Sequence, residues 1–258
     1  MYFDYFEALS GEPIRVDGVG HLRSPLVKDL YPLSGIGQEA YHFYLAFLSW
    51  DKDAIVKYDK LAGLRGAEKI ASTKALSAFD AVTLLKPTRE LCGEILSFFM
   101  LEDLVWDDGN RKYVAFLTDD DGQHVSGEVN RSNFEEVRNM MLQLNYLNLD
   151  KDTKEAHYTS DKAKELWERA QGFLKIEQDD EKEDRPEYRL GNIISKLCSI
   201  NPAYTYNNVK DLTIFQLYDA FFQASYMRSI ALNERIFSNH GGDKFNYSDW
   251  LKPITKNI

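Results

Sequence analysis

Apolar residues recur at helical spacing through most of the chain, and the longest such pattern runs from Leu212 to Asn239. Thr213 followed by Gln216 forms a capping box, which predicts that a helix begins at this point. The apolar positions extend around the side of this helix beyond a single stripe, and they are Ile214, Leu217, Tyr218, Phe221, Phe222, Ala224, Tyr226, Met227 and Ile230. A helix so long and so broadly apolar must be covered by the rest of the chain or by another chain.

The same periodicity predicts further helices along the chain. Residues 38–50 are apolar almost all round, which indicates a helix that is buried on most sides or docks a partner. Ser24 and Pro25 carry the cap and first-turn signals of a short helix, and Ser132 with Glu135 forms a second capping box. Other apolar patterns at helical spacing predict helices at residues 53–62, 67–85, 88–101, 160–176 and 190–197.

Two parts of the chain carry the signals of β structure. Residues 2–8 alternate aromatic and polar side chains, and together with residues 14–16 they predict an N-terminal hairpin. Residues 104–106, 112–118 and 124–129 are short strand candidates separated by turns rich in Asp, Asn and Gly, which predicts a three-stranded meander. The predicted fold class is therefore mainly α with a small antiparallel β component (α+β), as a helical bundle with an N-terminal hairpin and a three-stranded meander.

A run of charged residues divides the chain. Residues 177–187 read E-Q-D-D-E-K-E-D-R-P-E, and a segment of this composition is expected to be a solvated linker. We therefore predict an N-terminal α+β domain at residues 1–148, an amphipathic helix with the acidic linker at residues 149–187, and a C-terminal helical domain at residues 188–258.

The composition is that of an ordinary globular protein with an excess of acidic residues. Of the 258 residues 28% are charged, and the formal net charge is −10, so nucleic acids and anionic membrane surfaces are disfavoured as partners. No apolar run reaches the roughly 20 residues of a membrane span, and the first residues lack the basic region of a signal peptide. Cys92 and Cys198 lie far apart within apolar helical patterns, which favours free thiols in a reducing cytosol.

Signatures of catalysis and of cofactor binding are missing from the sequence. It contains no G-x-S-x-G, phosphate-loop or H-E-x-x-H motif and no G-x-G-x-x-G after a strand, and its five histidines are scattered. Asp119–Asp121 could hold Mg²⁺ or Ca²⁺ through carboxylate oxygens, but the tip of a hairpin explains three adjacent acids fully. We therefore expect no cofactor, no metal site, no catalytic residues and no enzymatic activity.

Four segments of the chain carry familiar packing patterns. The first comprises H-L-R-S-P-L-V-K-D-L at residues 21–30 and G-I-G-Q-E-A-Y-H-F-Y-L at residues 35–45. The second is G-E-V-N-R-S-N-F-E-E-V-R-N-M-M-L-Q-L-N at residues 127–145, and the third is the acidic linker. The fourth is L-T-I-F-Q-L-Y-D-A-F-F at residues 212–222, followed by D-W-L-K-P-I at residues 249–254. In these segments the chain resembles the tail assembly chaperone-like proteins of bacteriophages that infect Gram-positive hosts.

The resemblance implies a non-enzymatic role in tail morphogenesis. Proteins of this type coat the apolar tape-measure protein in the cytoplasm of the host bacterium until tail tube subunits polymerise around it. The expected partners are therefore the tape-measure or tail tube protein, with a homo-oligomer as a further option, but neither nucleic acid nor a membrane. An apolar helical partner requires aromatic grooves to cover it. The residues expected to supply them, each of which could instead belong to the core of the monomer, are Tyr41, Phe43, Tyr44, Phe47, Phe221, Phe222 and Tyr226.

Two other functions stay open at this point. A structural protein of the phage tail or baseplate could share the same four segments, and it would be located in the virion. A metal-dependent hydrolase that uses Asp119–Asp121 is the more remote alternative, because it requires a cation site that no other feature of the sequence supports.

Overall fold

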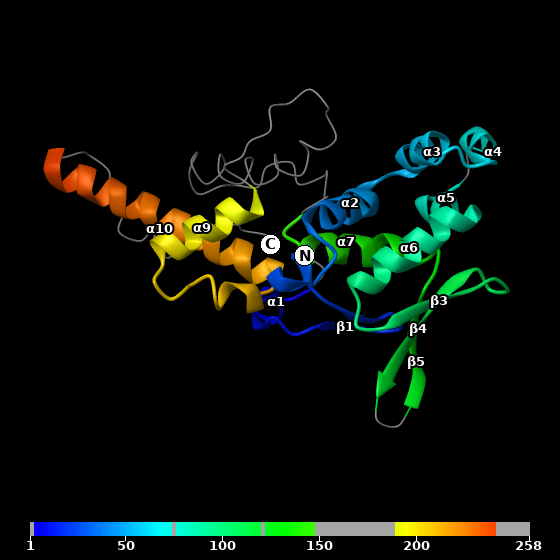
Figure 1. Ribbon diagram of the computed structural model, residues 1–258, viewed down its shortest axis with the longest axis horizontal. Coiled ribbons are helices and arrows are strands. Elements are labelled where there is room, and N and C mark those ends of the chain that lie inside the picture. The colour runs from blue at the N-terminus through cyan, green and yellow to red at the C-terminus, as the bar shows by residue number, and fades with distance from the viewer. Residues whose placement is uncertain (1–2, 74–75, 120–121, 148–188, 241–258) are drawn as a thin grey trace.

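A computed structural model of the chain describes residues 3–73, 76–119, 122–147 and 189–240. Helices dominate these ranges and two small antiparallel sheets lie among them (Figure 1), which confirms the predicted α+β fold class. The elements are α1 (Tyr5–Ser10), β1 (Ile14–Val16), β2 (Gly20–Leu22), η1 (Val27–Leu30), α2 (Gln38–Ser49), α3 (Lys52–Leu61), α4 (Ala67–Ser72), α5 (Ala78–Leu84), α6 (Lys86–Phe98), β3 (Asp103–Asp107), β4 (Lys112–Asp119), β5 (Gly122–Val129), α7 (Phe134–Leu144), α9 (Leu190–Ile200), η4 (Val209–Asp211) and α10 (Ile214–His240). The helix predicted at residues 160–176 and the acidic linker lie outside the described residues, and the division into domains stays a prediction.

The predicted N-terminal hairpin is confirmed only in part. Strands β1 and β2 pair antiparallel, with Ile14 opposite Leu22. The residues before them, predicted as a strand from their alternation, instead form helix α1, so that prediction is wrong. The Asp4 carboxylate accepts a hydrogen bond from the backbone N–H of Phe6 (2.9 Å), and Gly11 ends the helix in the left-handed conformation. These two caps make the segment a helix, although the alternation of aromatic and polar residues in it is typical of a strand.

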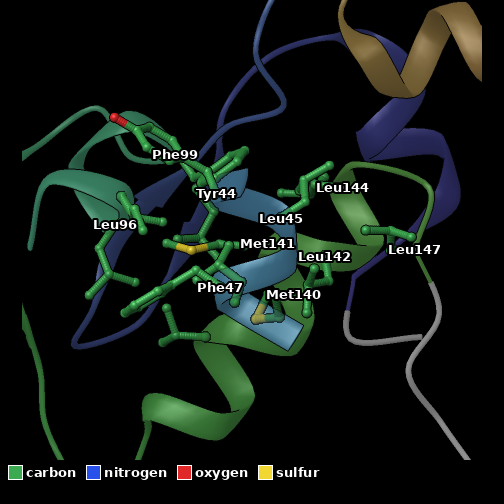
Figure 2. Close-up of a cluster of buried hydrophobic side chains, with 14 of the residues drawn as sticks. Tyr44, Leu45, Phe47, Leu96, Phe99, Met140, Met141, Leu142, Leu144 and Leu147 are labelled. Atoms are coloured by element: carbon green, nitrogen blue, oxygen red, sulfur yellow. The ribbon is translucent and has the colours of Figure 1, made fainter. Parts of the chain in front are cut away.

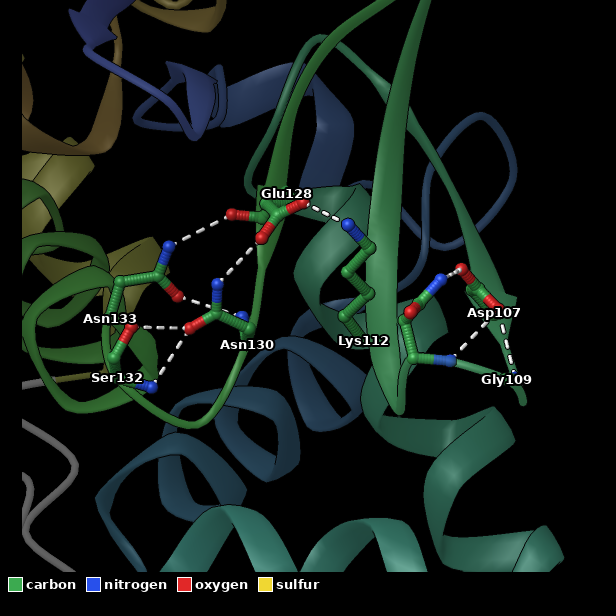
Figure 3. Close-up of polar contacts among 8 residues, drawn as sticks. Asp107, Gly109, Lys112, Glu128, Asn130, Ser132 and Asn133 are labelled. Carbon is green, nitrogen blue, oxygen red and sulfur yellow. Dashed lines mark hydrogen bonds and ion pairs between the residues drawn. The ribbon is translucent and has the colours of Figure 1, made fainter.

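The predicted three-stranded meander is confirmed as the sheet β3–β4–β5, in which neighbouring strands are antiparallel. In the turn between β3 and β4, the Asp107 carboxylate accepts hydrogen bonds from the backbone N–H groups of Gly109 (2.9 Å) and Asn110 (3.2 Å). The side-chain amide of Asn110 donates a third (2.7 Å) to the same carboxylate (Figure 3). Across β4 and β5, the Lys112 ammonium forms an ion pair with the Glu128 carboxylate. The turn chemistry read from the sequence therefore positions these strands.

The loop between β5 and α7 uses its polar side chains differently from the prediction. Ser132 and Glu135 do not form the predicted capping box, because Asn130 Oδ1 accepts hydrogen bonds from the backbone N–H (2.8 Å) and hydroxyl (2.6 Å) of Ser132 (Figure 3). The amide of Asn133 donates a hydrogen bond to the Glu128 carbonyl (2.9 Å) and accepts one from the Asn130 N–H (2.8 Å). These side chains attach the start of α7 to the sheet and do not cap the helix.

The prediction of one continuous helix over residues 67–85 is wrong, because this segment forms α4 and α5. Helix α4 ends at Ser72, and Thr73 takes an extended conformation. Helix α5 begins after Ser77, whose hydroxyl accepts a hydrogen bond from the Asp80 N–H (3.2 Å), while the Asp80 carboxylate accepts one from the Ser77 N–H (3.0 Å). This reciprocal cap is a start signal that the continuous apolar periodicity concealed.

Helix α2 lies in the core between α6 and α7. Figure 2 shows Leu45 and Phe47 of α2 gathered with Leu96 of α6 and Met141 of α7 in one buried cluster. Burial of a side chain of this size stabilises a fold by about 1.5–3 kcal/mol. The sequence predicts that the apolar segment at residues 38–50 is either buried or docks a partner. Burial within the chain covers most of its apolar surface.

Helix α10 is anchored at its start by residues from the N-terminal part of the chain. The predicted capping box is confirmed, since the Thr213 N–H donates to Gln216 Oε1 (3.0 Å) and the Gln216 N–H donates to Thr213 Oγ1 (3.1 Å). Ser24 does not cap a helix of its own, and its hydroxyl instead accepts a hydrogen bond from the Phe215 N–H (3.0 Å). The short helix that follows it, η1, begins only at Val27. Residues 191 positions apart in the sequence thus meet at the start of α10.

Candidate partner-binding groove

Helix α9 and the loop after it lie beside α10 (Figure 1), and an open groove runs along α10 at this place. Its volume is about 1220 Å³, and residues between Ser199 and Tyr204 line one side of it. The other side is α10 from Gln216 to Arg235, and Leu9 of α1 contributes near the start of that helix. With a rise of about 1.5 Å per residue, the α10 side spans about 28 Å, which is the length of a helix of about five turns.

The α10 side of the groove is an apolar strip made mainly of small side chains. Ala220, Ala224, Met227 and Ala231 follow three–four spacing and therefore share one face of the helix. Met227 is 44% exposed and Leu232 is 54% exposed, so apolar surface stays uncovered on the α10 side of the groove. Alanine leaves room for the close approach of a neighbour, and methionine adapts to different neighbours. A concave strip of this kind is typical of a surface that receives a helix.

A buried carboxylate forms part of the floor of the groove. Asp219 accepts hydrogen bonds from the hydroxyls of Tyr5 (2.6 Å) and Tyr146 (3.2 Å), which come from α1 and from the residues after α7. Burial raises the pKa of Asp219 above its ordinary value, although these two hydroxyls and the amide of Gln223 oppose the shift. Burial also raises the pKa of Tyr5 and of Tyr146. The three groups connect α1 and the end of α7 to α10 and give the groove a fixed polar base.

Two arginines form the charged edge of the groove. Arg228 and Arg235 are exposed, and their spacing of seven residues places them on one side of α10, about 10 Å apart along its axis. Among the described residues, neither guanidinium has a hydrogen bond or an ion pair. Among the described residues that line the groove, the charged ones are these two arginines and Asp219. The edge of the groove is therefore positive on a chain whose net charge is −10.

The four rings predicted on α2 are placed in or beside the core and do not line the groove. Tyr41, Tyr44 and Phe47 are buried, and Phe43 is partly buried. The Tyr41 hydroxyl donates a hydrogen bond to Asn145 Oδ1 (2.9 Å), and burial raises the pKa of Tyr44 to about 12. These contacts are intramolecular, so in the described structure the α2 rings serve packing. That they bind a partner stays a prediction.

The three rings predicted on α10 lie on faces of the helix other than the groove. Phe221, Phe222 and Tyr226 are buried, and none of them lines the groove. Phe222 stacks with Tyr146 (5.4 Å between ring centroids) and with Tyr218 (6.2 Å). The predicted rings thus fall into two sets on two helices, and the exposed α10 residues that line the groove are mainly apolar or basic and include no aromatic side chain.

The sequence places Ala224 and Met227 on the apolar surface of α10, but it does not predict that they and the other lining residues form a binding groove. The sequence contains part of the pattern that marks the groove. Alanines recur on one face of α10, and Arg228 and Arg235 are two helical turns apart. The wall of the groove opposite α10 has no recognisable pattern in the sequence. Leu9 and the residues between Ser199 and Tyr204 are joined to α10 only by the tertiary structure.

The described part of the chain gives no indication of a metal site. Within it, no three His, Cys, Asp or Glu side chains gather closely enough to hold a metal ion. Asp120 and Asp121 and the side chain of Asp119 lie outside that part, so the cation hypothesis is untested. None of the described helices is long and apolar enough to cross a membrane. That the protein is not an enzyme and needs no cofactor stays a prediction.

Comparison with known protein families gives a match in the C-terminal part of the chain. Residues 180–255 match the family model described as the YomV second domain. The match covers less than a third of the chain but includes α9 and α10, and therefore most of the groove lining. No curated protein and no solved structure matched the chain. The C-terminal segment is thus similar to the YomV second domain, and this similarity fits a phage-associated protein without addressing a role in tail assembly.

Proposed function

We propose that this protein is a non-enzymatic factor of phage tail morphogenesis, which binds the tape-measure or tail tube protein as an assembly chaperone. It acts in the cytoplasm of the host bacterium before the tail is complete. Two findings support the phage context, namely the resemblance of four segments to tail assembly chaperone-like proteins and the match of residues 180–255 to the YomV second domain. The groove beside α10 supplies the binding surface.

The exposed groove is the observation that carries this proposal. The α10 side of the groove spans about 28 Å, and the apolar strip from Ala220 to Ala231 covers about 16 Å of it, so about three turns of a partner helix can lie against the strip. The base of the groove is held by the contacts of Asp219 with Tyr5 and Tyr146, and its second wall by α9. A surface that is already formed before binding loses less conformational freedom on association.

Co-expression with a phage tape-measure protein, followed by affinity purification, tests the proposal. We expect a stable complex that Ala224→Trp and Ala231→Trp each weaken, because an indole fills the strip. Leu33→Trp, at a fully exposed position away from the groove, is the matched control and should leave the complex intact. A complex that is insensitive to both groove variants would refute the groove as the binding site. Absence of binding to both the tape-measure and the tail tube protein would refute the chaperone function.

Mass spectrometry of purified phage particles separates the chaperone from a structural tail protein. A chaperone that leaves before the tail is complete should be missing from mature particles, although it is abundant in the lysate of infected cells. Detection in particles at a stoichiometry similar to that of known tail proteins would instead establish the structural role.

A further inference from the structure

We propose that the partner segment bound in this groove is an amphipathic α-helix with two carboxylates about seven residues apart along one edge. The inference rests on the proposed function, since it names the chemistry of the partner that occupies the same groove. It is carried by Arg228 and Arg235 together with the apolar strip beside them.

The two arginines are the basic residues that line the groove in the described part of the chain, and Glu234, the acid next to Arg235 in the sequence, does not line it. Elsewhere in the described chain, Arg131 pairs with Asp80 (3.0 Å), and other basic residues pair in the same way. Arg228 and Arg235 are exposed at the groove edge and have no ion pair in the described structure. On a chain with a net charge of −10, an unpaired positive edge favours a negatively charged partner.

The spacing of the arginines specifies how the partner is built. Two helices that pack side by side repeat their contacts about every seven residues. A carboxylate pair with that spacing therefore faces both guanidiniums at once, and each guanidinium can bind a carboxylate through two parallel hydrogen bonds. The strip formed by Ala220, Ala224, Met227 and Ala231 lies next to the arginines, so small and apolar residues of the partner face it. This apolar strip gives no contact to a phosphate backbone, and the net charge repels one.

A set of three helical peptides tests the charge of the partner directly. Each peptide has about 21 residues, or three heptads, with Ala and Leu on one face and two Glu, two Gln or two Lys seven positions apart on its edge. Binding to the full-length protein is measured by fluorescence anisotropy at low salt. We expect the Glu peptide to bind about tenfold more tightly than the Gln peptide, and this preference should decrease as salt screens the pairs.

Charge reversal on the protein provides the matched comparison. In a variant with Arg228→Glu and Arg235→Glu, the preference should invert, so that the Lys peptide binds more tightly than the Glu peptide. Arg65→Glu changes an exposed arginine away from the groove and should retain the preference of the wild type. Circular dichroism of each variant establishes that the fold is retained.

Several outcomes would overturn the inference. Equal binding of the three peptides, or no binding by any of them, would remove the charge preference, and displacement of the Glu peptide by duplex DNA would identify a different kind of partner. A dimer in sedimentation that the double variant converts to a monomer would place a second copy of the chain in the groove. Failure of the tape-measure protein to bind, with the Glu preference and its inversion intact, would refute the proposed function and not the partner chemistry.

Discussion

Gly127 of β5 lies where the turn between β1 and β2 crosses the meander, and replacing it by alanine tests how closely the two sheets meet. A Cβ atom at Gly127 would lie 2.5 Å from the carbonyl carbon and oxygen of Val19 and 2.7 Å from the carbonyl carbon of Gly18. These neighbours are backbone atoms, so they cannot rotate away as the end of a side chain can. The turn would have to move by about 1 Å to reach an ordinary contact distance.

The cost of that movement follows from what the turn contacts. The Glu128 N–H donates a hydrogen bond to the Gly18 carbonyl (2.9 Å), and Val19 is buried against the core. Overpacking of a well-filled site costs about 1–3 kcal/mol, and loss of one backbone hydrogen bond costs about 0.5–1.5 kcal/mol. We therefore expect Gly127→Ala to destabilise the fold by about 3 kcal/mol, which corresponds to a fall in Tm of about 6–12 °C for a domain of this size.

Gly191→Ala provides a control with the opposite sign. Gly191 lies in the first turn of α9, and a Cβ atom there would have nothing within 4 Å. Because alanine loses less conformational entropy than glycine in a helix, this change should stabilise the fold by up to about 1 kcal/mol. Thermal unfolding followed by circular dichroism measures both variants. If Gly127→Ala leaves the Tm unchanged, the β1–β2 turn is not seated on β5 and the reasoning fails.

Three further predictions concern titration and reactivity. Burial raises the pKa of Asp219, so the carboxyl group binds its proton more tightly in the folded chain than in the unfolded chain. The stability of the fold should therefore decrease as pH rises through the raised pKa. Asp219→Asn should flatten that part of a profile of Tm against pH. Burial raises the pKa of Tyr218 and of Tyr44 to about 12, so their contribution to stability is complete below about pH 10 and is lost as pH rises further; tyrosinate absorbance should therefore appear together with unfolding. Burial also raises the pKa of Cys92 to about 12, so a thiol reagent should modify the partly exposed Cys198 first, and rapid labelling of Cys92 in the native protein would contradict its burial.

Local signals in the sequence predicted the elements whose hydrogen bonds are also local. Thr213 and Gln216 form the capping box expected of them, and Asp107 closes the β3–β4 turn with its own neighbours. Predictions failed where a side chain has a choice of partners. Ser24 accepts a hydrogen bond from Phe215, which is remote in the sequence, and no local rule anticipates that contact.

The groove is harder to predict from the sequence than the fold. Met227 is visible in the sequence as part of a broad apolar surface, but the sequence does not reveal which part of that surface the chain itself covers. The structure covers Phe222 and Tyr226 and leaves Met227 and Leu232 exposed, the reverse of what aromatic content suggests. Exposure depends on tertiary contacts, and those contacts involve residues as distant as Tyr5.

The hydrogen bond between Ser24 and Phe215 has a consequence for the folding of the chain during its synthesis on the ribosome. A ribosome adds about 5–20 residues per second, so the 191 residues between them take about 10–40 s to synthesise. Throughout that interval Val27 and Leu30, both buried in the finished fold, lack the segment that covers them on the α10 side. The nascent chain therefore exposes apolar surface for many seconds, and such surface is aggregation-prone until the C-terminal segment covers it.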